Sequence, residues 1–276
     1  YNYKTGDRIL QRRIDQYDET TFKNVSLDGN DVIINYTNGS KITLKDAKEQ
    51  QISLRGYTSG WANLYSYNNT FGNLTISGGT ASLDESYRGD FRTWYYTESV
   101  NNINASVVSN SVDIYGNDNA NTILGAKGGG VIRSYDGDDL IYGSSKGTNV
   151  IYSGTGNDTI HCGNDASTIF AGEGSDVIYC GRATDLIYYY SEDGNETVYN
   201  YKTGDRIFQR RIDQYDETTF KNVSLSGNDV IINYTNGNKI TLKDAKDQQI
   251  SLRGETHDRN PQYYSSGNLY NYNNTF

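Results

Sequence analysis

The sequence predicts an all-β repeat protein. Through the middle of the chain an isoleucine recurs about every nine residues, and the positions between are mostly small or polar. Residues 199–254 repeat the sequence of residues 1–56 almost without change. Both copies alternate apolar and polar residues around Asn-Gly turns, a pattern typical of paired strands. Self-similarity at fixed periods indicates a repeat architecture, in which each unit packs against its neighbours.

The duplicated segments predict small antiparallel β modules. In each copy, stretches such as VIINY, TNG and KITL follow one another, which predicts a hairpin around an Asn-Gly turn, and QQISL predicts a further strand. The copies differ at only four positions: Leu10/Phe208, Asp28/Ser226, Ser40/Asn238 and Glu49/Asp247. Such near-identity implies a tandem unit of about two hundred residues. We therefore expect the chain to be part of a larger array.

Residues 57–100 form a connector in this prediction. The range combines strand-like alternation with charged and aromatic residues, including Trp61, Trp94, Tyr95 and Tyr96. These side chains either pack between the modules or form an aromatic face for glycans or neighbouring chains. Tyrosine is abundant in the chain, with 26 residues, and it suits interfaces because its ring packs while its hydroxyl stays hydrated.

The nine-residue repeat occupies about residues 101–200. Its isoleucines are Ile114, Ile123, Ile132, Ile141, Ile151, Ile160, Ile169, Ile178 and Ile187. Each of the last eight closes a block whose first six positions are small or polar, as in SGTGND (153–158) and AGEGSD (171–176). A disordered glycine-rich tract would not hold an isoleucine at a fixed interval over eight blocks. The spacing therefore indicates an ordered repeat.

These blocks resemble the nonapeptide G-G-x-G-x-D-x-U-x of RTX proteins, the hemolysin-type calcium-binding family, in which U is a large apolar residue. The resemblance implies that six residues turn and three form a short strand, so that two blocks make one coil of a parallel β-roll. Residues eighteen apart would then stack at roughly 4.8 Å. The expected fold is all-β, a parallel β-roll (RTX solenoid) flanked by small antiparallel β capping modules.

The two edges of such a roll have different chemistry. At the sixth position of alternate blocks, one edge carries Asn121, Asp139, Asp158, Asp176 and Glu196, and the other carries Gly130, Asn149, Ser167 and Asp185. At the third position, the first edge carries Asp118, Asp136, Thr155, Glu173 and Asp193, and the second carries Lys127, Lys146, Asn164 and Arg182. One edge is thus acidic and the other is largely basic.

An acidic edge of this kind predicts a bound cation. Two carboxylates stacked at roughly 5 Å repel each other by about 3 kcal/mol at an effective dielectric constant of about 20. Calcium accepts carboxylate and backbone carbonyl oxygens in a flexible shell, whereas magnesium gives up its water reluctantly. Glycine permits the turns that direct carbonyls inward. We therefore predict Ca²⁺ as the cofactor, with calcium-dependent folding of residues 101–200.

The resemblance implies that each ion takes carbonyl oxygens and sixth-position side chains from two stacked turns. The strongest expected site pairs Asp158 with Asp176, and the next pairs Asp139 with Asp158. Weaker sites pair Asn121 with Asp139 and Asp176 with Glu196. The full predicted metal-binding set is Asn117, Asn119, Asn121, Ser134, Tyr135, Asp136, Gly137, Asp139, Ser153, Gly154, Thr155, Gly156, Asp158, Ala171, Gly172, Glu173, Gly174, Asp176 and Glu196.

The other edge lacks an acid at three of its four sixth positions, so no calcium is expected there. Lys127, Lys146 and Arg182 are expected to satisfy that edge instead. Cys162 and Cys180 are eighteen apart on this edge, which makes them direct neighbours in the roll. Either a disulfide or a pair of reduced thiols is compatible with this spacing.

The expected domain order follows from the roll and its need for caps, since the last coil would otherwise leave an unpaired sheet edge. Residues 1–56 are predicted to cap a preceding repeat unit, and 57–100 to connect it to the roll at 101–200. Residues 201–254 are predicted to cap this roll, and 255–276 to begin the next connector.

Composition and motifs exclude several functions. A net charge of −9 argues against a nucleic-acid partner, because phosphates require basic patches. No apolar run is long enough for a membrane span, and the sequence lacks H-E-x-x-H, G-x-S-x-G and phosphate-loop motifs. We therefore expect a protein that is not an enzyme.

The expected function is that of a calcium-binding structural module in a large secreted bacterial surface protein, such as an adhesin, surface layer or extracellular fibre. The resemblance implies type I secretion and folding outside the cell. Alternatives are a secretion and folding appendage of an RTX enzyme or toxin, and a glycan-binding module. Expected partners are further copies of the array, through sheet edges or the Tyr-rich strand 270–276, and a cell-surface or glycan target.

Overall fold

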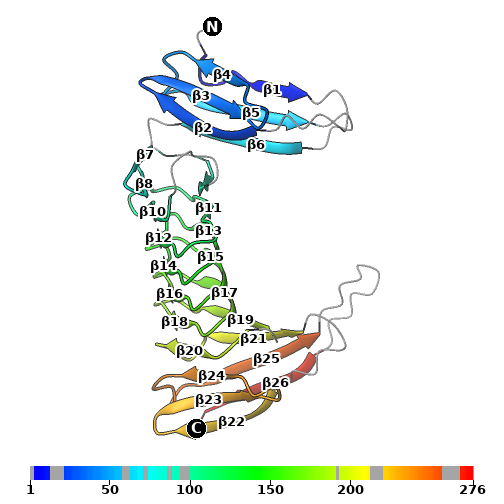
Figure 1. Cartoon of the computed structure of the whole chain (residues 1–276). Coiled ribbons are helices and arrows are strands. Elements are labelled where there is room, and N and C mark those ends of the chain that lie inside the picture. The colour runs from blue at the N-terminus through cyan, green and yellow to red at the C-terminus, as the bar shows by residue number, and fades with distance from the viewer. Residues whose placement is uncertain are drawn as a thin grey trace.

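The computed structural model describes residues 3–12, 22–57, 63–70, 74–85, 87, 89–93, 100–190, 193–211, 220–256 and 268–275. These residues form 26 strands. A flattened parallel roll occupies the middle of the molecule, and a small β module lies at each end (Figure 1). The predicted fold class, an all-β parallel roll flanked by small β modules, is confirmed. In the described part of the chain, no helix is long and apolar enough to cross a membrane.

The N-terminal module contains two three-stranded sheets, ordered β1-β5-β6 and β2-β3-β4. Its strands are β1 (Ile9–Arg12), β2 (Phe22–Asp28), β3 (Asp31–Tyr36), β4 (Lys41–Leu44), β5 (Gln51–Tyr57) and β6 (Asn63–Thr70). The predicted hairpins are present, because β2, β3 and β4 pair in antiparallel fashion. The turns place Gly29 at φ 62° and Gly39 at φ 83°, which glycine adopts without steric cost.

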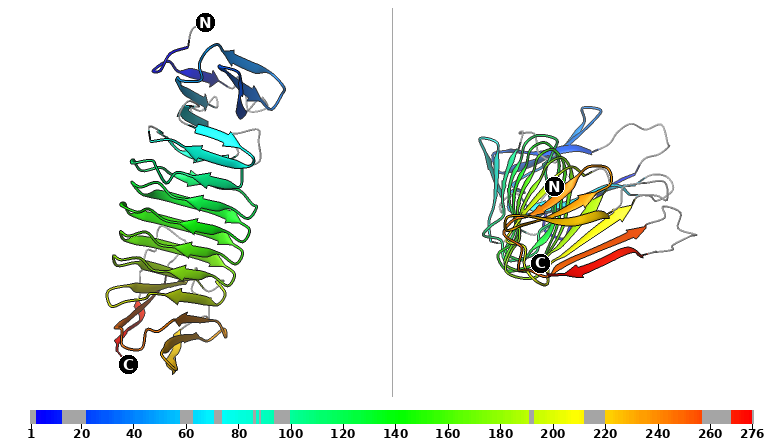
Figure 2. Two further views of the ribbon diagram at one scale, coloured as in Figure 1. Left: turned by 90° about the vertical axis from the view of Figure 1, so that its left-hand side faces the viewer. Right: turned by 90° about the horizontal axis from the view of Figure 1, so that it is seen from below.

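The roll has two parallel sheets that face each other, and the chain alternates between them. The first sheet contains β8 (Thr80–Leu83), β10 (Asn102–Asn104), β12 (Thr122–Leu124), β14 (Leu140–Tyr142), β16 (Thr159–His161), β18 (Val177–Tyr179) and β20 (Glu196–Tyr199). The second contains β9 (Phe91–Arg92), β11 (Ile114–Tyr115), β13 (Gly130–Asp136), β15 (Asn149–Thr155), β17 (Ser167–Glu173), β19 (Leu186–Tyr190) and β21 (Arg206–Arg211). The stacked coils are visible from the side and along the axis in Figure 2.

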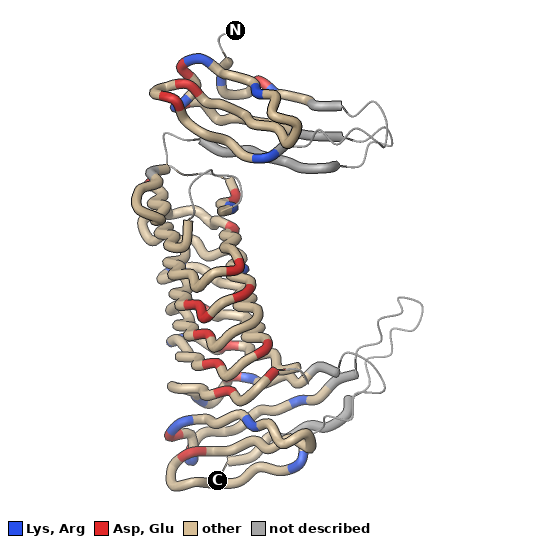
Figure 3. Tube along the Cα trace, viewed as in Figure 1, with Lys and Arg blue, Asp and Glu red and all other residues tan. Residues whose placement is uncertain are grey.

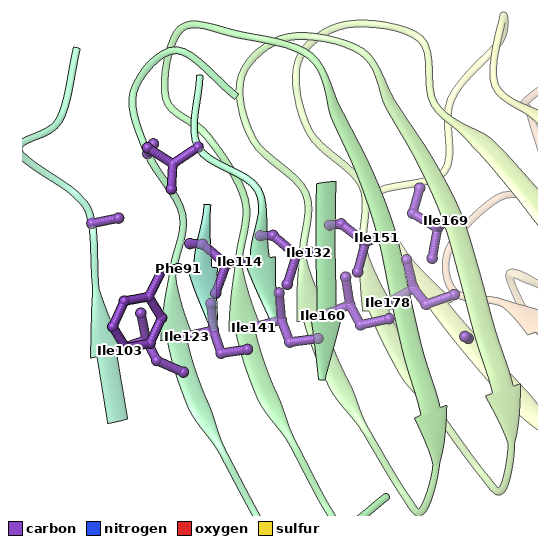
Figure 4. Packing of buried hydrophobic residues seen from close by; sticks show 14 of the residues in the cluster. Phe91, Ile103, Ile114, Ile123, Ile132, Ile141, Ile151, Ile160, Ile169 and Ile178 are labelled. Carbon is purple, nitrogen blue, oxygen red and sulfur yellow. The ribbon is translucent and has the colours of Figure 1, made fainter. Parts of the chain in front are cut away.

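The core of the roll is the isoleucine ladder (Figure 4). All nine repeat isoleucines are at most 1% exposed. They stack in register between coils, for example Ile151 beside Ile169 in one sheet and Ile160 beside Ile178 in the other. One interval, from Ile141 to Ile151, is ten residues long instead of nine. The extra residue lies in a turn and does not change the register, because Ile132 still pairs with Ile151. The ladder holds successive turns at a constant spacing, which fixes the two edges.

The roll extends further towards the N-terminus than residue 101. β8 pairs in parallel with β10, and β9 pairs in parallel with β11. β7 (Leu74–Ser77) pairs in antiparallel fashion with β8 and forms the first edge of that sheet. Part of the range predicted as a connector therefore belongs to the roll. The predicted aromatic face of Trp61, Trp94, Tyr95 and Tyr96 lies outside the described residues.

The C-terminal module joins the last coil through both sheets. It contains β22 (Phe220–Ser226), β23 (Asp229–Tyr234), β24 (Lys239–Leu242), β25 (Ile250–Thr256) and β26 (Asn268–Asn274). β24 pairs in parallel with β20, and β25 pairs in parallel with β21. β26 pairs in antiparallel fashion with β25, so the Tyr-rich strand lies in a sheet of its own chain.

Candidate calcium sites

Four carboxylates form a column along one edge of the roll. Asp139, Asp158 and Asp176 immediately precede β14, β16 and β18, and Glu196 begins β20. Each is at most 2% exposed. Acidic residues recur from coil to coil along the roll (Figure 3). The structure thus brings together the four acids that the sequence placed on one edge. Glu196 follows Asp176 by twenty residues instead of eighteen, because two extra residues lie near Tyr189 and Tyr190, but the register is kept since Val177 pairs with Thr197.

One oxygen of each carboxylate accepts a hydrogen bond from the preceding coil. Asp139 Oδ1 accepts from the Asn121 amide at 2.7 Å, Asp158 Oδ1 from the Asp139 amide at 2.8 Å and Asp176 Oδ1 from the Asp158 amide at 2.8 Å. Glu196 Oε2 accepts from the Asp176 amide at 3.2 Å. The column is therefore held in place by the backbone itself.

The second oxygen of each carboxylate is buried without a hydrogen-bond partner. These atoms are Oδ2 of Asp139, Asp158 and Asp176 and Oε1 of Glu196. A buried polar atom without a partner costs about 1–3 kcal/mol, and a charged group costs more. Four such atoms on consecutive coils of one edge fit a hard divalent cation, which would be bound by these residues and by turn carbonyls. Bound calcium would supply the missing positive charge.

Burial raises the pKa of these carboxyls. The pKa of Asp139 rises to about 7, that of Asp158 to about 6 and that of Asp176 to about 7, with burial as the largest cause in each case. Burial also raises the pKa of Glu196 well above its ordinary value, and the nearby Asp176 charge adds to this rise. Protons and calcium therefore compete for the same oxygens.

We expect the calcium-free roll to become more stable as the pH falls from 8 to 5. With raised pKa values the folded state binds more protons than the unfolded state, so this stability is present below the ordinary carboxyl pKa of 3.8 and is lost as the pH rises to about 7. Circular dichroism in chelator at pH 5, 6.5 and 8 checks this. Greater β-structure at pH 8 than at pH 5 would contradict it, and the calcium midpoint should rise at the lower pH.

The turns of this edge depend on glycine. Gly156 has φ 128° and Gly174 has φ 144°, a region that L side chains rarely adopt. A Cβ on Gly174 would lie 1.8 Å from the carbonyl oxygen of Gly156, and one on Gly172 would lie 2.0 Å from that of Gly154. Successive turns are therefore packed backbone against backbone. Gly137, at φ 110°, continues the same column.

Several other predicted ligands make contacts between coils. The Ser153 hydroxyl donates to the Ala171 carbonyl at 2.6 Å, and the Ser134 hydroxyl donates to the Ser153 carbonyl at 2.9 Å. The Glu173 carbonyl accepts from the Gly156 amide at 2.9 Å. These contacts align the turns, and the metal-binding role of each residue stays a prediction.

The third-position side chains of this edge differ in burial: Asp193 is buried and its charge adds to the rise in the pKa of Glu196 that burial causes, whereas the others are exposed. Asp136, Thr155 and Glu173 are exposed, and the Thr155 hydroxyl donates to Asp136 Oδ1 at 2.9 Å. Tyr135 stands beside Gly154 in the ladder with φ 77°. Among the described residues, no cluster of three or more His, Cys, Asp or Glu side chains could hold a metal ion. A calcium site here would therefore need further oxygen ligands beside the carboxylates, and turn carbonyls can supply them.

The N-terminal end of the column is satisfied by amide side chains. Asn121 Oδ1 accepts from the Asn117 amide at 2.9 Å, and Asn121 Nδ2 donates to Asn117 Oδ1 at 3.0 Å. Asn119 also donates to Asn117 Oδ1, through its backbone amide, at 3.0 Å. These bonds occupy the side chain that a site between Asn121 and Asp139 would need, and the weaker calcium binding expected there stays a prediction.

The opposite edge satisfies its carboxylates without a metal. Asp185 accepts from the Ser167 amide and the Gly181 amide, each at 2.8 Å. Asp205 accepts from the Asp185 amide at 2.8 Å and pairs with Lys202 Nζ at 3.0 Å. The sequence interpretation missed Asp205 because it lies within the duplicated module, although it stands twenty residues after Asp185. The structure therefore supports a difference between the two edges.

The predicted basic contacts of that edge are not formed. The described side chains of Lys127, Lys146 and Arg182 make no hydrogen bond or ion pair. Lys146 and Arg182 are exposed. The cation that contacts the edge is Lys202, whose Nζ also donates to the Gly181 carbonyl at 2.9 Å. The carboxylates of this edge are satisfied by backbone amides and Lys202, whereas Asn149 Oδ1 and Ser167 Oγ are buried without a hydrogen-bond partner.

Cys162 and Cys180 are free thiols in the structure. Burial raises the pKa of both thiols, and for Cys180 the neighbouring Cys162 adds to the rise. The reduced alternative is therefore the one that the structure shows.

Two aromatic ladders on the outer faces were missed by the sequence interpretation. On one face Tyr142, His161, Tyr179 and Tyr199 stack at 4.5–4.9 Å between ring centroids. On the other face Tyr152, Phe170 and Tyr188 stack at 4.5 Å, and Arg133 lies 4.5 Å from the Tyr152 ring. The signal was the residue that follows each ladder isoleucine, which is repeatedly aromatic. These stacks add packing between coils outside the thin core.

Comparison with known proteins gives a family match within the roll. The family model of the RTX calcium-binding nonapeptide repeat (4 copies) matches residues 144–178 and 152–187. No curated protein matches the chain. Among solved structures, the extracellular lipase LipA from Serratia marcescens is similar over 86% of this chain and 30% of that chain, with 11% identity and a TM-score of 0.28. The match thus covers less than a third of that lipase chain.

Proposed function

Because the chain contains RTX calcium-binding nonapeptide repeats, we propose that its roll is a structural module of a large secreted bacterial surface protein that calcium holds folded. The observation that carries the proposal is the column of buried carboxylates. Each of Asp139, Asp158, Asp176 and Glu196 keeps one oxygen without a partner. Calcium ions between successive coils would satisfy these oxygens and remove the repulsion along the column.

Such binding would couple the fold to the external calcium concentration. A ligand that binds only the folded state stabilises it by about 2.7 kcal/mol at one hundred times its dissociation constant. The stabilising free energies of several stacked calcium sites would add together along the column. RTX repeats occur in proteins that leave the cell by type I secretion, and we infer the same route here, with folding delayed until the chain meets calcium outside.

The duplication favours a structural role over an appendage of an enzyme. Residues 1–56 and 199–254 differ at only four positions, which is expected of an array whose units build length and valency. Calcium-bound rolls between repeated modules would give a stiff rod. We therefore favour an adhesin, surface layer or extracellular fibre as the whole protein.

A calcium titration of the full chain by circular dichroism tests this function. We expect β-structure to increase cooperatively as calcium is added to the chelated chain, and magnesium to be much less effective. A chain whose roll is fully folded in chelator at pH 8, with no change on adding calcium, would refute the dependence on calcium.

A further inference from the structure

The two copies of the duplicated module lie in different surroundings. In the C-terminal copy, β21 pairs in parallel with β19 and β24 pairs in parallel with β20, so both sheets continue those of the roll. In the N-terminal copy the corresponding strands are β1 and β4. Among the described strands, β1 pairs only with β5 and β4 pairs only with β3. Each therefore presents an open edge.

These open edges lie at the end of the N-terminal module that is remote from its own roll (Figure 1). In the C-terminal copy of the duplicated segment, residues 199–254, β21 and β24 lie on the side nearest the preceding coils of the roll (Figure 1). The two modules thus have the same polarity along the molecule. A roll placed before β1 and β4 would meet the N-terminal module as the existing roll meets the C-terminal one.

Equivalent residues differ in burial accordingly. Asp205 is 0% exposed in the C-terminal copy, whereas its counterpart Asp7 is exposed. Ile240 is 0% exposed, whereas Ile42 is only partly buried. Leu10, on β1, is 61% exposed. The apolar and polar groups that contact a roll in one copy are thus accessible in the other.

The loop before β1 has the same internal hydrogen bonds as the loop that contacts the roll in the C-terminal copy. Tyr3 donates its hydroxyl to the Asp7 carbonyl at 2.6 Å and accepts from the Ser53 amide at 2.9 Å. The same two bonds, from Tyr201 to Asp205 and from Ser251 to Tyr201, occur in the C-terminal copy at 2.8 and 3.0 Å. Docking would therefore require little rearrangement of the loop.

The C-terminal copy shows which bonds a docked roll would make. Asp205 Oδ1 accepts from the Asp185 amide of the roll at 2.8 Å. The Lys243 amide donates to the Val198 carbonyl at 2.8 Å. Asp7 and Lys45 occupy the corresponding positions of the N-terminal copy. Both are therefore available to a roll that arrives at the open edges.

We infer that the open edges of β1 and β4 form a docking surface for the last coil of a second copy of this roll. Both sheets of the module would extend both sheets of that roll through parallel pairing, which is strand addition to an exposed edge. The inference rests on the proposed function, since the occupant is a coil that folds with calcium.

Two of the four positions that differ between the copies lie at this surface. Phe208 packs beside Tyr188 of the roll with 5.6 Å between ring centroids, and Asn238 Nδ2 donates to the Asp193 carbonyl at 2.6 Å. Leu10 and Ser40 replace them in the N-terminal copy. The backbone pairing can be kept while these side-chain contacts change.

Hydrogen exchange on two chains tests the inference. The first is the full chain of 276 residues. The second carries an additional copy of residues 74–198, which includes the first coil of the roll, joined directly to Tyr1 so that the junction found at Tyr199 is restored. With calcium, we expect amides of β1 and β4 to exchange at least about tenfold more slowly in the extended chain. The differences Leu10/Phe208 and Ser40/Asn238 distinguish their peptides from those of β21 and β24 by mass.

The outcomes separate this inference from the proposed function. Failure of the original roll to gain protection with calcium would count against the proposed function. If both rolls are protected but the exchange of β1 and β4 is unchanged, the docking surface alone is overturned. The same holds if the roll peptides show two populations, because one population would then come from an added roll that stays uncapped and unfolded.

Matched substitutions in the extended chain make the test specific. Asp7→Ala removes the expected acceptor and should reverse much of the added protection of β1. Asp28→Ser, which inserts the residue of the other copy at an exposed position, should leave it unchanged. Equal effects of the two substitutions would contradict the proposed contact.

Discussion

Asp158→Asn is expected to raise the calcium concentration at the folding midpoint by about tenfold or more, equivalent to about 1.4 kcal/mol. Asp158 stands between Asp139 and Asp176 in the column, so both adjoining sites would lose a charged ligand. The asparagine still supplies an oxygen for the Asp139 amide, which Asp158 Oδ1 accepts at 2.8 Å. Its amide group would face the cation with the wrong polarity.

The same substitution should not weaken the calcium-free roll. Burial raises the pKa of Asp158 to about 6, so at pH 8 the folded calcium-free chain carries an unfavourable buried charge that asparagine removes. We therefore expect equal or greater β-structure in chelator. Opposite effects with and without calcium would not arise from a general packing defect.

Asp165→Asn is the matched control, because Asp165 is an exposed acid in a turn of the opposite edge. It removes the same charge from the chain, and its midpoint should move by much less than that of Asp158→Asn. Circular dichroism titrations of the three proteins at pH 8 provide the comparison. Equal shifts for the two variants would show that overall charge, and not the column, sets calcium affinity.

Gly174→Ala is expected to destabilise the calcium-loaded roll by several kcal/mol. Gly174 has φ 144°, and an added Cβ would lie 1.8 Å from the Gly156 carbonyl oxygen. Backbone strain in this region costs about 1–3 kcal/mol, and the contact would also push two coils apart. The neighbouring ladder and the carboxylate column would lose their spacing.

Gly227→Ala separates the two causes. Gly227 also has a positive φ, 64°, but nothing lies within 4 Å of the added Cβ. We expect it to cost only about 1 kcal/mol. Thermal unfolding in saturating calcium measures both variants. A Gly174→Ala variant no less stable than Gly227→Ala would contradict the close backbone packing of the turns.

The periodic parts of the structure could be predicted because they repeat. A buried isoleucine in each block and an acid at alternate sixth positions fix a ladder and an edge, and Ile151 beside Ile169 illustrates the predicted register. The hairpins of the modules followed from local alternation and Asn-Gly turns. The periodic spacing of the residues was thus sufficient to predict both the fold of the roll and the positions of the column acids.

The first coil could not be predicted in the same way. Its inward positions carry Ala81 and Phe91 instead of isoleucine, so the period is lost although the pairing continues. The hydrogen bonds that satisfy the carboxylates of Asp185 and Asp205 could not be predicted either, because they come from turn amides and from Lys202 of the duplicated segment. Sequence spacing gives the position of a carboxylate but not its hydrogen-bond partners.

Acidity alone does not explain the difference between the two edges. Asp185 is as buried as the acids of the column, yet both of its oxygens accept backbone amides. Asp139, Asp158 and Asp176 each have one such bond and one oxygen without a partner. The calcium-binding capacity of an edge therefore depends on what the turn amides leave unsatisfied.

A crystal structure of the calcium-loaded chain, with anomalous scattering used to locate the ions, would show whether the carboxylate column binds calcium. We predict calcium between Asp139 and Asp158 and between Asp158 and Asp176, coordinated by their free oxygens and by turn carbonyls. We predict none beside Asp185 and Asp205. Equal occupancy on both edges, or a folded roll without calcium at the column, would contradict the account.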